Sequence, residues 1–156
     1  MNFQIHALPA APFTALFALA DADLAAHCAR RVTADAKPGY PCRVSLLDAE
    51  PGERLILVNH EHLAAESPFR SRHAVFVREG AEQARPEPGE IPEQLDRRAL
   101  AVRAFSAAHD MLAAEIAEPG RLAGVMERLL ADPAAAFLHL HSPARGCYFA
   151  RAERAR

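Results

Sequence analysis

Apolar and polar residues alternate in short stretches along most of this chain, and apolar residues take helical spacing in two places. The stretch Phe3–Leu8 alternates and predicts a first strand. Apolar positions four residues apart predict a helix that begins with Asp21 as its N-cap and runs to about Ala34, with Cys28 on its core face. Helical spacing over residues 121–133 predicts a second helix, which a proline ends.

Turn-like segments separate three pairs of apolar runs and predict three β-hairpins. The paired runs are residues 42–48 with 54–60, 99–106 with 111–118, and 136–141 with 146–152. Residues 54–60 are almost continuously apolar, which predicts a central place in a sheet. The polar segment Asn59–His73 follows as a long loop, of the kind that is often functional, and a further short strand is expected at 74–79.

These elements predict an α+β fold in which residues 1–156 form a single domain, with two main helices packed on a mostly antiparallel sheet. A net charge of −2 argues against a nucleic-acid partner, and the chain has no apolar run long enough for a membrane span. Three cysteines without a C-x-x-C pair fit a reducing, cytoplasmic location. The oligomeric state stays open.

The segment AFLHLHSPARGCYFA, residues 136–150, carries the chain's most concentrated candidate chemistry. Residues two apart in a strand share a face, so His139 and His141 project together, away from the two intervening leucines. A turn centred on Ala144 would place His141 opposite Cys147 and His139 opposite Phe149. This register puts both histidines on one face with the cysteine and leaves Tyr148 on the other face; a slip of one residue would separate them.

Three interpretations fit this cluster. Cys147 could be a nucleophile, with His141 as its partner, His139 as an orienting group and Gly146 offering a backbone N–H to an oxyanion. His139, His141 and Cys147 could instead bind zinc, the one cofactor that these ligand types suggest. Alternatively, the histidines are half-buried with satisfied hydrogen bonds and the cysteine belongs to the core.

Other polar residues could complete a site. His62 belongs to a second His-x-His segment at the start of the expected loop and would reach the cluster if that loop folded over it. Arg43 and Arg70 could grip an anion, although structural ion pairs are the more common role of such arginines, and Arg103 has the same two interpretations. Seventeen arginines against one lysine reduce the weight of any single arginine.

Several segments together resemble a bacterial family of unknown function, DUF1203, over nearly the whole chain. The resemblance rests on PGYPCRVSLLDAEPGERLILVNHEH, SPFRSRHAVFVRE, IPEQLDRRALAVRAF and HLHSPARGC. It implies a small, soluble, cytoplasmic protein without a known activity. It also implies that Cys42, Arg43, His62, Arg70, His139, His141, Gly146 and Cys147 form one site. The family usually has Asn-Ala where this chain has Ser142-Pro143.

The leading hypothesis is that the protein binds, or binds and transforms, a small anionic or carbonyl-containing molecule in a pocket beside the Asn59–His73 loop. Cys147, His141 and His139 would carry the chemistry, while Arg43, Arg70 and His62 would hold the ligand. A non-catalytic interaction module and a metal-binding protein are the alternatives, and whether the protein is an enzyme stays open.

Overall fold

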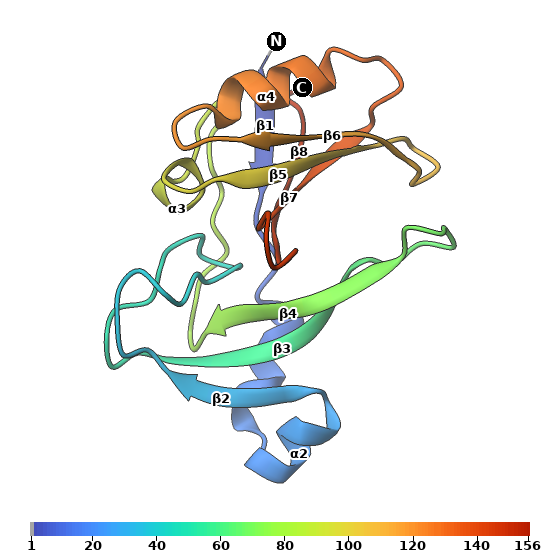
Figure 1. Ribbon diagram of the computed structural model, residues 1–156. Helices are drawn as coiled ribbons and strands as arrows, with labels where there is room; N and C mark the ends of the chain where they lie inside the picture. The colour runs from blue at the N-terminus through green and yellow to red at the C-terminus, as the bar shows by residue number, and fades with distance from the viewer. Residues whose placement is uncertain (1) are drawn as a thin grey trace.

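The computed structural model describes residues 2–156 and contains two antiparallel sheets, which confirms the α+β class (Figure 1). One sheet has five strands in the order β1-β8-β7-β5-β6, namely β1 (Phe3–His6), β8 (Tyr148–Arg154), β7 (Phe137–His141), β5 (Leu100–Phe105) and β6 (Met111–Ala117). The other has the order β2-β3-β4, namely β2 (Ala29–Thr33), β3 (Arg54–Leu63) and β4 (Ser71–Arg78). The helices are α1 (Ala11–Thr14), the 3-10 helix η1 (Ala15–Ala18), α2 (Asp21–Ala26), α3 (Glu93–Asp96) and α4 (Leu122–Leu130).

Helix α4 covers one face of the five-stranded sheet (Figure 1). Its apolar positions recur at helical spacing, and Met126 and Leu130 are buried against the strands. Leu138 and Leu140 of β7 point into the same core. The other face of this sheet is turned toward β3 and β4, and side chains from the two sheets meet between them (Figure 1).

Several predicted elements are confirmed. The first strand, helix α4, and the hairpins β5–β6 and β7–β8 all form where the apolar pattern placed them. Strand β3 is the centre of its sheet, as its continuous apolar run predicted. No helix within residues 2–156 is long and apolar enough to cross a membrane.

Three predicted elements are wrong. The helix expected to reach Ala34 ends at Ala26, because Cys28 takes a positive φ of 52° in a turn that leads into β2, and this cysteine is exposed. Residues 42–48 form no strand but an irregular loop, in which Leu46 also has a positive φ. The expected loop at Asn59–His73 is mostly strand, since β3 runs to Leu63 and β4 begins at Ser71.

Candidate functional site

The β7–β8 hairpin places its two histidines on the face that looks toward β3 and β4. His139 and His141 project together, away from Leu138 and Leu140, as their spacing predicted. The predicted register, however, is wrong by one residue at the turn: His141 pairs with Tyr148 rather than with Cys147. A bulge in β8 follows, so His139 pairs with Arg151 rather than with Phe149.

This shift exchanges the neighbours of the two histidines. The Tyr148 ring lies 5.1 Å from the His139 ring and 5.7 Å from the His141 ring, measured between centroids. Phe149 instead packs with the leucines in the core on the other face. The longer turn moves Cys147 out of the cross-strand pairing with His141, and its main-chain oxygen accepts a hydrogen bond from the Ser142 N–H.

The inner face of the three-stranded sheet contributes further histidines. His60 and His62 alternate with Glu61 on β3, and His60 pairs across the strands with His73 on β4. The His62 ring lies 5.0 Å from the His141 ring and 5.9 Å from the His139 ring, and it stacks on Tyr148 at 5.2 Å. The two His-x-His segments therefore face each other across the gap between the sheets.

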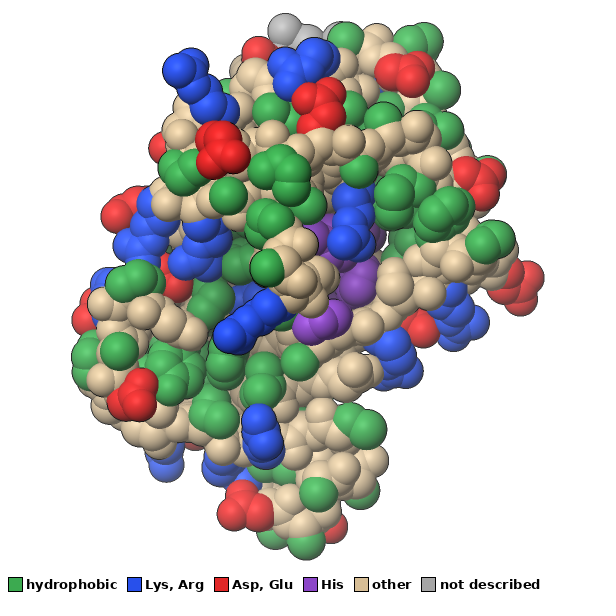
Figure 2. All heavy atoms as spheres, in the orientation of Figure 1, with side chains coloured by type: hydrophobic (Ala, Val, Ile, Leu, Met, Phe, Trp, Pro, Cys, Tyr) green, Lys and Arg blue, Asp and Glu red, His purple; other side chains and the backbone are tan. Residues whose placement is uncertain are grey.

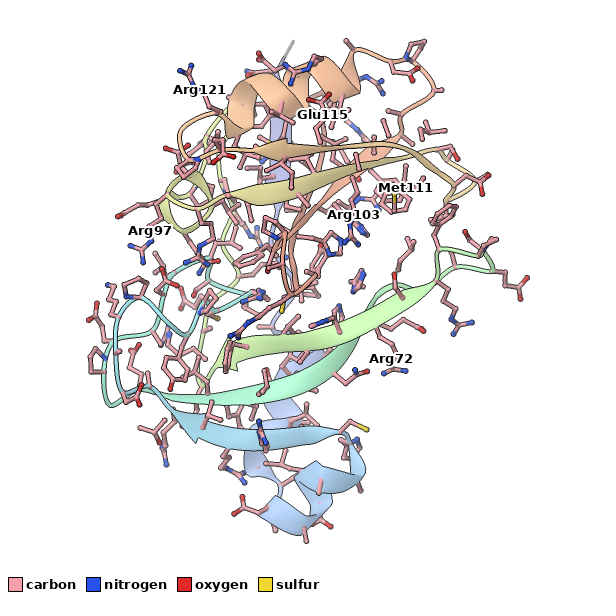
Figure 3. All side chains as sticks on the ribbon, in the orientation of Figure 1. Arg72, Arg97, Arg103, Met111, Glu115 and Arg121 are labelled. Atoms are coloured by element: carbon pink, nitrogen blue, oxygen red, sulfur yellow. The ribbon has the colours of Figure 1, made fainter. Side chains whose placement is uncertain are left out.

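We call this group the histidine layer; it consists of His60, His62, His73, His139 and His141. In Figure 2, histidine side chains line a recess between the two sheets, beside a basic side chain. Figure 3 labels Arg103 at that place. Arg103 on β5 and Arg151 on β8 are the two cross-strand partners of His139, so both lie on the face that carries the histidines.

Burial keeps the imidazoles uncharged. Burial, together with the nearby His60 and Arg103, lowers the pKa of His62 to about 4. Burial also lowers the pKa of His139 to about 2 and that of His141 to about 3. These rings are therefore neutral at pH 7, so each has one N–H donor and one nitrogen acceptor.

The hydrogen bonding of these rings is incomplete. His141 Nδ1 lies 2.9 Å from the Gly146 main-chain oxygen, so this nitrogen carries the proton and Nε2 is the acceptor. His62 Nδ1 and His139 Nδ1 are buried and have no hydrogen-bond partner within residues 2–156. Buried polar atoms are nearly always paired in native proteins, so two unpaired nitrogens in one cluster are an unusual feature of this fold.

A second feature lies next to the histidine layer, where the turn of residues 142–147 meets the edge of β4. Here Arg43 is only 2 % exposed. Its Nε donates to the Tyr148 main-chain oxygen at 2.6 Å, and its Nη1 donates to the Pro41 main-chain oxygen. The guanidinium lies 4.0 Å above the centroid of the Phe149 ring. Burial lowers the pKa of Arg43 to about 10, so it still carries its charge at pH 7.

Arg43 lines a cavity of about 330 Å³, which we call the Arg43 cavity. Its walls are Gly39, Pro41, Arg43, Leu57, His73, Ala74, Phe76, Ser142, Arg145, Cys147 and Phe149. No carboxylate of the described chain forms an ion pair with Arg43, and Asp48 is instead held by Arg97 at 2.7 Å and Arg98 at 3.4 Å. The buried guanidinium therefore faces a largely apolar cavity without a counter-ion.

The predicted site residues thus fall into separate places. His62, His139 and His141 come together in the histidine layer, whereas Arg43 and Cys147 line the adjoining cavity. Arg70 belongs to neither, because its exposed side chain is paired with Glu61 at 2.9 Å. No group of three or more His, Cys, Asp or Glu side chains within residues 2–156 is suited to hold a metal ion.

Sequence reasoning missed two residues that touch both places. His73 belongs to the histidine layer and also lines the Arg43 cavity. Tyr148 packs its ring on His62 while its main-chain oxygen holds Arg43. The alternation of His73, Val75 and Val77 was a usable signal, because it puts the histidine on the inner face once 71–78 is assigned to one strand.

The comparison with known families identifies the chain. The sequence profile described as Protein of unknown function (DUF1203) matches residues 39–154. The chain belongs to this family. The DUF1203 match includes every residue of the histidine layer and of the Arg43 cavity. No curated protein and no solved structure matches the chain.

Proposed function

We propose that this DUF1203 protein binds a small organic anion in the Arg43 cavity. The observation that carries the proposal is a buried guanidinium without an acidic partner that lines a cavity. An unpaired buried charge is costly, and a bound carboxylate or phosphoryl group would supply the missing counter-ion. Two nitrogens of Arg43 are held by main-chain oxygens, which leaves Nη2 free for the ligand.

The cavity walls indicate what the rest of the ligand resembles. Pro41, Leu57, Phe76 and Phe149 give the cavity a mostly apolar lining, so the anionic group would be attached to an apolar or aromatic body. Arg145 and Ser142 supply further polar contacts from the turn of residues 142–147. A cavity of about 330 Å³ lies at the small end of the range for small-molecule sites.

Cys147 is the strongest nucleophile among the cavity walls, so a ligand with an electrophilic carbonyl could be transformed there. In that case the thiol would pass its proton to a neighbouring imidazole, its sulfur would bond to the carbonyl carbon, and the carbonyl π electrons would move onto the oxygen, while Arg43 would hold the anionic group. His141 is less suited to be the partner of this thiol than the sequence suggested, because Tyr148 rather than Cys147 lies opposite it. His73, which lines the same cavity, takes that place in the proposal.

Alkylation of the cysteines with two reagents of the same shape tests the anion site. Iodoacetate carries a negative charge and iodoacetamide does not, so their rate ratio at each cysteine reports the local attraction for anions. Cys28 is exposed and serves as an internal reference. We expect the iodoacetate-to-iodoacetamide ratio at Cys147 to exceed that at Cys28 by about tenfold, because a focused positive potential concentrates anions.

Two variants sharpen this test. Arg43→Met should reduce the ratio at Cys147 to the value at Cys28, whereas Arg70→Met removes an exposed arginine paired with Glu61 and should leave the ratio unchanged. If Arg43→Met does not fold, protection of Cys147 by benzoate in the wild-type protein provides the same information. Equal ratios at Cys147 and Cys28, together with no protection by benzoate, would overturn the proposal.

A further inference from the structure

The recess above the histidine layer contains a second unpaired cation. The Arg103 side chain is partly buried and forms no ion pair or hydrogen bond with another residue of the described chain. It lies directly across from His139, which is only 2 % exposed and whose Nδ1 has no hydrogen-bond partner.

 Two independent observations therefore apply to neighbouring residues: Arg103 has no counter-ion, and His139 Nδ1 is buried without a hydrogen-bond partner.

We propose that this recess binds an inorganic or phosphoryl oxyanion between Arg103 and the imidazoles of His62, His139 and His141. This inference does not depend on the Arg43 cavity, because different residues carry it. Arg103 would supply the charge and two parallel N–H donors that suit a tetrahedral oxyanion. His62 and His139 would donate N–H groups, which would give their unpaired Nδ1 atoms a partner, and His141 would donate from Nε2 once it takes up a proton.

The charges around the recess favour an anion over a metal cation. The groups that face the imidazoles are His60 and His62 from β3, His73 from β4, Arg103 from β5, His139 and His141 from β7, and Tyr148 and Arg151 from β8. Glu61 points to the other face of β3, where it pairs with Arg70, and Glu153 is paired with Arg151. The described residues thus surround the imidazoles with cations and place no free carboxylate there to attract a metal ion.

A bound oxyanion should also draw protons onto the histidines. The imidazoles are neutral because burial and neighbouring cations disfavour their charged form. A doubly negative ion beside them favours the charged form, so the protein should take up protons as the ion binds. Proton uptake separates a histidine-lined site from one made of arginine alone.

Sulfate titration by calorimetry at about pH 6 tests the proposal, since sulfate does not itself titrate at that pH. Repeating the titration in buffers of different ionisation enthalpy gives the number of protons taken up, and we expect about one per sulfate. Arg103→Gln should weaken sulfate binding by about tenfold or more. Arg70→Met, which removes an exposed arginine that belongs to neither place, is the matched control and should leave both the affinity and the proton uptake unchanged.

His139→Phe provides a second variant that keeps an aromatic ring of similar size in the layer. It should reduce the proton uptake even where sulfate still binds to Arg103. Sulfate binding that Arg103→Gln does not weaken, or that involves no proton uptake, would overturn the proposal. Stoichiometric binding of zinc ions that sulfate does not oppose would overturn it in favour of a metal site.

Discussion

At the scale of single residues, His139 and His141 show how one residue type takes two roles on one strand. Both are buried, at 2 % and 1 % exposure, and both rings are neutral at pH 7. His141 is tied by its Nδ1 to the Gly146 main-chain oxygen and so holds the turn of residues 142–147 against β7. His139 has no such bond, and its buried Nδ1 has no hydrogen-bond partner among the described residues.

This difference predicts opposite effects for the same substitution. His141→Phe should lower the free energy of unfolding by about 1 kcal/mol, because it removes the hydrogen bond to Gly146. It should also speed hydrogen exchange of the Gly146 amide, which donates to Ser142 within the same turn. His139→Phe should be neutral or stabilising, since it replaces an unsatisfied polar ring with an apolar one.

Urea unfolding of the two variants, combined with amide exchange, checks this prediction. His139→Phe is the matched control, because it makes the same chemical change two residues away on the same face. Equal destabilisation of both variants would show that packing, rather than the bond to Gly146, sets the cost of losing His141.

At the scale of elements, helix α4 closes the outer face of the five-stranded sheet. Met126 is fully buried there, and its side chain packs among the core residues from β5, β7 and β8. Met111, at the start of β6, is only partly buried against Phe105 and Phe137. The two methionines therefore allow the same truncation to be compared in two environments.

Met126→Ala should lower the free energy of unfolding by about 3 kcal/mol, because it opens a cavity beneath α4. Met111→Ala should cost less than about 1 kcal/mol, because solvent can fill the space left at a partly exposed site. Thermal or urea unfolding of both variants gives the comparison. A similar loss in both would mean that α4 is not closely packed on the sheet.

Elements set by local patterns could be predicted from the sequence, whereas those set by distant contacts could not. The helical spacing in α4 and the short β5–β6 connection left little ambiguity. The apolar residues spaced four apart after Asp21 are also compatible with a helix that reaches Ala34. Residues Ala29–Thr33 instead form strand β2, which pairs with β3. Residues 42–48 alternated like a strand, yet their main chain bonds instead to scattered partners, among them Phe76 and Leu8.

The candidate site divides in the same way. That His139 and His141 share a face follows from strand geometry alone. The six-residue connection between β7 and β8 decided which residue faces His141, and a bulge decided the next pair. Neither leaves a clear mark in the sequence. The meeting of His62 with His141 depends on how two sheets pack, so no local pattern could reveal it.

At the scale of the whole molecule, the histidine layer joins the two sheets. Apolar clusters lie on either side of it, with Leu63, Phe105 and Phe137 at one end and Phe13, Val58 and Val75 at the other. The contact between the sheets therefore contains neutral imidazoles between two apolar clusters. Protonation of these rings would place several positive charges close together beside Arg103 and Arg151.

The stability of the protein should therefore fall in mild acid. In the unfolded chain each histidine has a pKa of about 6.5, whereas in the folded protein that of His139 is about 2 and that of His141 about 3. Below pH 6.5 the unfolded state thus binds more protons than the folded state, so the free energy of unfolding decreases as the pH falls. For these two residues the expected loss between pH 6.5 and about pH 5.5 is about 2 kcal/mol.

Urea unfolding at a series of pH values measures this loss directly. His139→Phe should reduce the dependence on pH by about a third, because His62, with a pKa of about 4, contributes as much as His139 and His141. His27→Phe, in the turn after α2 and outside the histidine layer, is the matched control and should leave the slope unchanged. A free energy of unfolding that stays constant from pH 7 to about pH 5.5 would mean that the rings gain protons without opening the gap between the sheets.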